Sequence, residues 1–414
     1  MKFISENHEN CWNAALKLLQ PSQKELEHGL ELHDTLFAMD HFGFLPYGTW
    51  NEAFVEMWNE LKAKNIGQRA LQERMSHVHY DQCCRDPECA ARFRTVMRSS
   101  GLKCMVHTVA EGKSREADFK RMADNVQLLR VFRDTISQAG SVADIRKINE
   151  EGRIAVIWSV NGPPLVGALE DLHEEMQWID VWERMGVRRM HMSYNRRNFA
   201  ADGCAESANG GLSALGRELI ARLNRVGIIV DVPHTGARSS IEAAQLSEKP
   251  IMASHTASKA LFDYIRCKDD ETLRAIADKD GLVGVYASSR MLGGTGDLPM
   301  MLRHIRYIAD LIGSRHVGIG TDTMYMHLWP TSDRISAYEN AEFTDRWWGN
   351  WREFPNPNKN IPVPNETHYG SLGWLNWPLF TVGLVKSGFS DEEIADILGR
   401  NFLRVLAANR EGEN

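Results

Sequence analysis

Residues 228–236 read IIVDVPHTG, residues 250–256 read PIMASHT and residues 316–322 read HVGIGTD. Each stretch is a short apolar run that ends at a side chain able to bind a metal or move a proton: His234, His255 or Asp322. In a parallel α/β barrel, polar residues at the carboxyl ends of the strands meet at one mouth, where the chemistry takes place. For each histidine taken alone, the alternative is that the side chain only packs in the core or caps a turn. Three such endings together predict a hydrolase that activates water with a metal ion.

Outward from these stretches, eight strands can be read, each followed by a helical pattern. The pattern is clearest in SALGRELIARLNRVG (213–227) and DLPMMLRHIRYIADLIG (297–313), which both end at a glycine. Eight such units predict one α/β domain over residues 1–414, a (β/α)8 TIM barrel. A doubly wound sheet is the alternative, but no GxGxxG motif follows the first strand. The expected strands are 35–43, 102–109, 153–160, 187–194, 227–234, 250–255, 281–288 and 316–322.

Several segments extend beyond this repeat. Residues 1–34 predict an N-terminal helical extension, and Ser390 with Glu393 predicts a capping box at the start of the last helix. The segments 44–100 and 323–370 exceed ordinary connection lengths, which is typical of lids or interfaces. The second insertion includes the Trp-rich stretch 346–370. An aromatic lid and a subunit interface both remain open for the tryptophans Trp347, Trp348, Trp351, Trp374 and Trp377.

Composition excludes several classes of protein. The chain has 414 residues, is 43% hydrophobic and 25% charged, and carries a formal net charge of −7, which indicates a folded core and no basic surface for nucleic acid. The N-terminus lacks the order of a signal peptide, and no apolar run approaches the ~18 residues of a membrane span. Seven scattered cysteines indicate reduced thiols, so we expect a cytoplasmic protein without a membrane partner. A zinc site at Cys83, Cys84 and Cys89 is a weaker alternative, because their spacing matches no common ligand motif.

Taken in order, five motifs resemble the membrane (renal) dipeptidase family of the amidohydrolase superfamily. They are GLSALGRELIARLNRVGIIVDVPHTG (211–236), PIMASHTAS (250–258), IRCKDDE (265–271), HVGIGTD (316–322) and LGRNFLRVL (398–406). The resemblance runs with gaps from about residue 100 to residue 409. It implies a (β/α)8 barrel with a two-zinc site that hydrolyses dipeptides and tolerates a D-residue at the C-terminal position.

The resemblance also implies roles for single residues. His234 and His255 match the two histidines that hold the second zinc. Asp322 matches the acid/base that serves the attacking water and the leaving amine. Arg266 matches the arginine that grips the substrate carboxylate, a task for which its planar fork of donors is suited.

The chain departs from the family pattern at three strand ends. The first strand should end His-x-Asp, whereas the nearest match is His41-Phe42-Gly43, with glycine at the Asp position. The third strand should end with a glutamate that bridges both metals, whereas the chain offers Val160 or Asn161, depending on register. The fourth strand should end with a substrate-binding histidine, and Tyr194 stands there.

These departures remove two carboxylates that would offset the charge of two divalent ions. We therefore expect one zinc per chain rather than two, held by His234 and His255 with Asp322, His41 or water completing the site. A barrel without any metal is the alternative.

The loop after the fourth strand is dense in hydrogen-bond donors, which favours substrate recognition by Tyr194, Asn195 and Asn198 together with Arg266. An ordinary polar loop with internal ion pairs is the alternative. Other histidines are weaker candidates. His33-Asp34 could be an alternative ligand pair, or it could cap the start of a strand. The His77/His79 pair fits a loop or an interface better than a metal site. His107 could line the mouth or pack in the core.

The sequence thus predicts a metal-dependent hydrolase of dipeptidase type, with Asp322 as the catalytic residue, acting on an amide bond of a small, carboxylate-bearing or dipeptide-like substrate. We expect a homo-oligomer, a dimer or higher. A metal-free barrel that binds ligands or serves as a scaffold is one alternative. A non-hydrolytic enzyme such as a lyase on the same barrel is the other, because fold does not fix function.

Overall fold

The computed structural model describes residues 3–47, 57, 59–61, 63–64, 68–165, 171–325 and 365–410. Its central feature is one parallel sheet with the strand order β1-β2-β4-β5-β6-β7-β8-β9, to which β3 is added beside β4. The strands are β1 (Met39–Gly43), β2 (Cys104–Ala110), β3 (Ile136–Gln138), β4 (Ile154–Val160), β5 (Val187–His191), β6 (Ile229–Asp231), β7 (Met252–Thr256), β8 (Leu282–Val285) and β9 (Val317–Ile319).

The two ends of this strand order meet and close the sheet into a barrel. The backbone N–H of Asp322, just after β9, donates to the carbonyl of Phe42 in β1 at 2.8 Å. At the same seam the carboxylate of Asp40 accepts from the backbone N–H of Thr321 at 2.9 Å and from its hydroxyl at 2.6 Å. The fold is the (β/α)8 TIM barrel that the sequence predicts.

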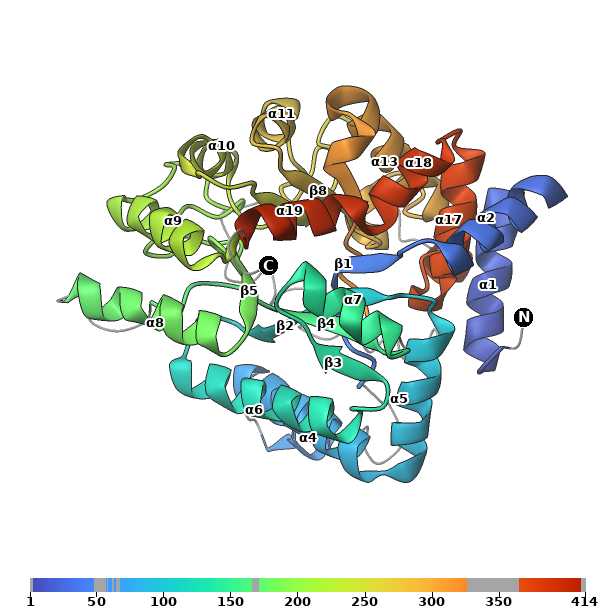
Figure 1. Ribbon diagram of the computed structural model, residues 1–414, viewed down its shortest axis with the longest axis horizontal. Helices are drawn as coiled ribbons and strands as arrows, with labels where there is room; N and C mark the ends of the chain where they lie inside the picture. The colour runs from blue at the N-terminus through green and yellow to red at the C-terminus, as the bar shows by residue number, and fades with distance from the viewer. Residues whose placement is uncertain are drawn as a thin grey trace.

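Helices connect successive strands and surround the sheet (Figure 1). The N-terminal helix α2 packs along α17 near the C-terminus, so both ends of the chain contribute to one side of the outer layer. The helices are α1 (Glu6–Leu19), α2 (Gln23–Thr35), α4 (Gln68–Arg85), α5 (Pro87–Ser99), α6 (Arg115–Val131), α7 (Val142–Glu150), α8 (Leu172–Arg184), α9 (Ala214–Val226), α10 (Ala237–Leu246), α11 (Asp270–Asp278), α12 (Ser289–Leu292), α13 (Leu298–Ile312), α16 (Glu366–Ser371), α17 (Trp377–Lys386), α18 (Asp391–Ala395) and α19 (Asn401–Asn409).

The helix signals in the sequence have the expected structural effect. Helix α9 begins after the N-cap Ser213 and ends at Gly227, whose φ of 73° lies in the left-handed region that glycine adopts without strain. Helix α13 ends at Gly313, and Ser390 forms the expected capping box with Glu393 at the start of α18.

Two details of the strands differ from the sequence reading. The first strand begins at Met39 and not at residue 35, because the amphipathic helix α2 continues through Thr35. The short strand β3 was not expected, since its three residues carry too little pattern to distinguish a strand from a loop. Each of the eight expected ranges otherwise overlaps a strand of the barrel, and β2 and β7 run one residue past the expected end.

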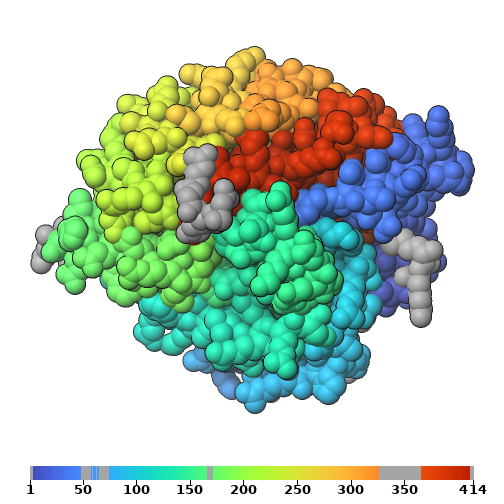
Figure 2. Space-filling model, viewed as in Figure 1, coloured from blue at the N-terminus to red at the C-terminus, as the bar shows by residue number. Residues whose placement is uncertain are grey.

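Helix α19 covers the amino-terminal end of the barrel. Its residues Phe402, Val405 and Leu406 form one core cluster with the first residues of several strands, such as Met39 and Cys104. In Figure 2 this helix, in red, runs across the face toward the viewer. Because this end is filled by apolar side chains, chemistry is confined to the opposite, carboxyl end.

The Trp-rich insertion lies largely outside the described residues, and with it Trp347, Trp348 and Trp351. Trp374 and Trp377 are described and are buried in the main core, 3% and 0% exposed. The Trp374 indole donates to Asp40 at the barrel seam at 3.1 Å, and Trp377 packs against Phe380, so neither ring forms an exposed lid. No helix in the described ranges has the length and apolar character needed to cross a bilayer.

Candidate active site

The structure brings His234 and His255 together at the carboxyl end of the barrel. His255 belongs to β7 and His234 lies three residues beyond β6, and their Nε2 atoms are 3.0 Å apart. Burial and the cations nearby, Arg266 first among them, hold the pKa of both imidazoles well below the ordinary value of 6.5. Both rings are therefore neutral at neutral pH, which is the form that binds metal ions.

The spacing of the pair fits a divalent cation. Two imidazoles bound to one tetrahedral Zn²⁺ at about 2.0–2.1 Å place their nitrogens about 3.3 Å apart. The observed 3.0 Å needs a shift of only a few tenths of an ångström. Within the described ranges no group of three or more His, Cys, Asp or Glu side chains is arranged to hold a metal. The pair supplies two of the four ligands that a tetrahedral Zn²⁺ takes.

Phe42, not His41, reaches this pair from β1. The Phe42 ring stacks on His255 with centroids 3.9 Å apart and an angle of 14° between the planes. His41 points toward α19, 5.6 Å from the Phe402 ring, and a Cβ added at Gly318 would fall 2.0 Å from its Cε1. Gly318 lies near the start of β9, so His41 sits deeper in the barrel than the mouth. The register shift between Asp40 and Gly43 produces this arrangement, because a bulge changes which side chains point inward.

Asp322 stands just after β9 with a φ of 56°, in the left-handed region that few residues other than glycine adopt. Asn195 at the same mouth has a φ of 62°. Burial raises the pKa of the Asp322 carboxyl to about 6, although Arg266 acts to lower it. A carboxylate with this pKa can exchange protons near neutral pH.

Arg266 is 1% exposed and lies between the strand ends that carry the two histidines. Its guanidinium donates to the carbonyl oxygen of Pro233 and, at 3.3 Å, to that of His255. These bonds hold the turn after β6 against β7, while other N–H groups of the fork remain without a bond to this backbone. Arg266 therefore has a structural contribution that the sequence reading did not include.

The loop after β5 packs against the histidine pair. The Tyr194 ring stacks on His234 with centroids 3.9 Å apart, and the Lys113 ammonium lies over the same Tyr194 ring, 5.5 Å from its centroid. Asn195 contacts His234 directly, with Oδ1 2.6 Å from the imidazole Nδ1. Asn198 instead holds the loop itself, because its amide donates to Met192 and accepts from two backbone N–H groups.

The structure adds residues that the sequence reading missed. Asp231 and Ser254 lie buried beneath the histidine pair, and Ser254 contacts His255. Glu111, which follows β2, accepts from the Asn161 amide at 2.9 Å and pairs with Arg121. Signals existed in the sequence, because Asp231 interrupts an apolar strand and Glu111 directly follows one.

Asn161 also resolves the register at the end of β4. Val160 belongs to the hydrophobic core, whereas the Asn161 amide contacts Thr108 and Glu111. The polar position at this strand end is therefore Asn161, an amide where the family pattern has a carboxylate.

The remaining histidine and cysteine candidates lie elsewhere. His33 bridges Thr381 and the Ser100 carbonyl at 3.0 Å each, and His77 pairs with Asp124 on an exposed helix face. His107 is buried and accepts from the Leu45 N–H, which makes it part of the core. The seven cysteines are free thiols, and those of α4 and α5 form no metal cluster in the described ranges.

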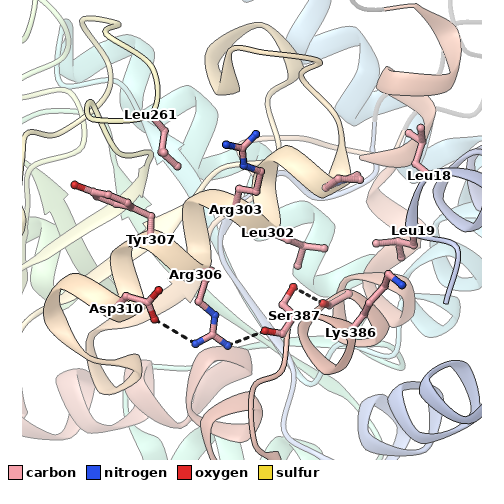
Figure 3. A pocket seen from close by; sticks show the side chains of 12 residues that line it. Leu18, Leu19, Leu261, Leu302, Arg303, Arg306, Tyr307, Asp310, Lys386 and Ser387 are labelled. Atoms are coloured by element: carbon pink, nitrogen blue, oxygen red, sulfur yellow. Dashed lines mark hydrogen bonds and ion pairs between the residues drawn. The ribbon is translucent and has the colours of Figure 1, made fainter. Parts of the chain in front are cut away.

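A surface pocket of about 530 Å³ lies apart from this mouth (Figure 3). It is formed by the end of α1, by α13 and by α17, all in the outer helical layer, and the residues of the candidate active site do not line it. Arg306 at its rim is bound to Asp310 and to the Ser387 carbonyl.

Comparison with known proteins shows the family of the chain. The model of the membrane dipeptidase family, peptidase family M19, matches residues 53–340. The chain belongs to this family. Among curated proteins it is 29% identical over 204 residues to dipeptidase aclJ of Aspergillus oryzae, covering 47% of each chain. It is 24% identical over 287 residues to dipeptidase tcpJ of Claviceps purpurea, covering 68% of this chain and 57% of the relative. The chain thus spans about half the length of the curated relatives it matches.

Two solved structures share the fold. An amidohydrolase from Pseudomonas aeruginosa superimposes with a TM-score of 0.67 at 24% identity, covering 92% of this chain and 98% of the other. A metallopeptidase from Rhodobacter sphaeroides, solved with a phosphinate mimic of the dipeptide L-Ala-D-Ala, gives 0.62 at 16% identity, covering 91% and 99%.

Proposed function

We propose that this protein is a metal-dependent hydrolase of dipeptidase type that cleaves the amide bond of a small, carboxylate-bearing substrate. The observation that carries the proposal is the His234–His255 pair, two neutral imidazoles whose Nε2 atoms face each other at 3.0 Å at the barrel mouth. Membership of the M19 family and similarity to proteins named dipeptidases support it.

We propose one metal ion per chain, zinc by preference. Two imidazoles are the nitrogen ligands that Zn²⁺ favours. Phe42 covers one face of His255 with an apolar ring, and Asn161, at the end of β4, carries a neutral amide. Neither side chain supplies the negative charge that a second divalent ion at this position would require.

A divalent cation at the pair would polarise an amide carbonyl and make water a better nucleophile. Asp322 would accept the proton of the attacking water and deliver it to the leaving nitrogen. Its pKa of about 6 keeps it ionised at neutral pH yet basic enough to take a proton. Tyr194, stacked on His234, would exclude water from one side of the substrate.

The substrate carboxylate would be bound by the N–H groups of Arg266 that are not committed to backbone carbonyls. Tyr194 and Asn195 remain proposed contacts at the mouth. His41 is left out because its ring lies beside Phe402, and Asn198 because its amide is bonded within its own loop. Seven free cysteines fit a reducing compartment, which favours a cytoplasmic protein. A homo-oligomer stays a prediction.

The test is hydrolysis of L-Ala-D-Ala and L-Ala-L-Ala by the purified protein, with release of free alanine followed by chromatography. Activity that is lost with a chelator and restored by Zn²⁺ is the expected result. Metal binding with other products from a wider panel would favour a lyase-type reaction. Absence of any bound metal after incubation with zinc would favour the scaffold alternative.

A further inference from the structure

Asp231 is a fully buried carboxylate in the barrel interior. It accepts from the Ser254 backbone N–H at 2.9 Å and from the Ser254 hydroxyl at 2.6 Å. Arg189 and His191 lie 3.0 Å and 3.1 Å from its Oδ2 atom. Although burial acts to raise it, these cationic and polar neighbours hold the pKa of Asp231 below its ordinary value. Asp231 is thus an anion, and an anion accepts protons and donates none.

The Asp231 anion determines the direction of the hydrogen bond between Ser254 and His255. Ser254 has one hydroxyl proton, and the 2.6 Å contact directs it to Asp231. The Ser254 oxygen is then the acceptor for His255, whose Nδ1 lies 2.9 Å away. His255 therefore carries its proton on Nδ1, which leaves a lone pair on Nε2.

Asn195 acts on His234 in the same way from the other side of the mouth. Its Oδ1 lies 2.6 Å from His234 Nδ1 and also accepts from the Cys204 thiol at 3.4 Å. An amide oxygen can only accept, so His234 also carries its proton on Nδ1. The Nε2 atoms of both rings then face each other at 3.0 Å with lone pairs, an arrangement that is repulsive without a cation between them.

We propose that Asp231 is a positioning residue that, through Ser254, holds the proton of His255 on Nδ1 and so prepares Nε2 for a metal ion. Asn195 is the positioning residue for His234. The inference rests on the proposed function and deepens it, since it assigns the selection of the metal-binding tautomer to three residues outside the ligand pair. The left-handed backbone of Asn195 places its side-chain amide against the His234 imidazole.

Two variants test the inference, each with a matched control. Ser254→Ala removes the hydroxyl that links Asp231 to His255 but leaves Asp231 paired with Arg189. A substitution at Asp231 itself would break that ion pair as well. Ser247→Ala is its control, because Ser247 is also buried but bonds Asn224 and a backbone carbonyl.

Asn195→Gly deletes the acceptor and keeps the positive φ, which glycine adopts freely. Asn209→Gly is its control, since Asn209 also has a positive φ, 43°, but its side chain caps the Arg238 N–H. Zn²⁺ affinity, measured by competition with a chromophoric chelator, is the readout, together with thermal melting of each metal-free protein.

We expect each test variant to bind Zn²⁺ about 10–100-fold more weakly than the parent, as for other residues that orient metal-bound histidines. The controls should bind with parental affinity. Parental affinity in both test variants would overturn the inference and leave the proposed function standing. A parent that binds no Zn²⁺ would overturn both. If Ser254→Ala fails to fold, Asn195→Gly decides the outcome.

Discussion

Replacing Asp322 by Asn is the most direct test of the proposed chemistry. The two side chains are nearly isosteric, and both tolerate the left-handed backbone found there, with φ 56°. The substitution therefore removes a proton acceptor and leaves the barrel and the histidine pair in place. Asp280→Asn is a matched control, because Asp280 also has a positive φ, 53°, but forms ion pairs with Arg315 and Arg404 on the outer surface.

The expected loss follows from the role of the carboxylate. General acid–base transfer contributes about 10²–10⁴-fold, so kcat/KM should fall by at least about 100-fold, equivalent to about 2.7 kcal/mol of transition-state stabilisation. The pKa of Asp322, about 6, also fixes the pH dependence of the parent. With that pKa, roughly nine-tenths of the carboxyl is ionised at pH 7 and roughly one-tenth at pH 5. Since the base must be ionised, parental activity should drop by at most about tenfold between these pH values.

A bound divalent cation near Asp322 would move this acid limb to lower pH, so a pKa of about 6 is its upper bound. The assay is release of amino acids from dipeptides between pH 5 and 8, with thermal melting of parent and variant. The reasoning is refuted if Asp322→Asn keeps near-parental activity, or if it loses activity only because it melts far below the Asp280→Asn control.

Three further predictions concern the metal and two buried ionisable side chains, Arg266 and Asp40. Mass spectrometry of the native protein should find about one divalent ion per chain, and two tightly held ions would contradict the roles given to Phe42 and Asn161. Arg266→Lys should weaken substrate binding by ~2–3 kcal/mol, since an ammonium cannot make the bidentate contact. It should also lower the melting temperature, because the two bonds from Arg266 to backbone carbonyls are lost. An unchanged melting temperature would show that those bonds add little. Burial raises the pKa of Asp40 from 3.8 to about 7, so the folded state favours the protonated form. Its stabilising effect is complete below about pH 4 and is lost as pH rises through 7. Urea unfolding should show this loss in the parent and a flatter profile in Asp40→Asn.

The positions of the elements could be predicted because they depend on local physics. A buried parallel strand reads as an apolar β-branched run, and α9 and α13 end where a glycine permits the left-handed conformation. Eight such units allow few topologies, since parallel strands need crossover helices of one hand. The positions of His234, just after β6, and of His255, near the end of β7, therefore follow from the sequence.

Side-chain direction was decided only by the tertiary structure. A bulge of one residue in β1 turns Phe42 into the mouth and His41 toward α19, and no local pattern in the sequence marks that shift. The same holds for Asp231 and Ser254, whose contact joins two strands 23 positions apart in the chain. By itself the sequence determined the barrel and the two histidines at its carboxyl end. Only the folded chain determined which neighbours orient those histidines, because hydrogen-bond direction depends on distances of a few tenths of an ångström between residues remote in sequence.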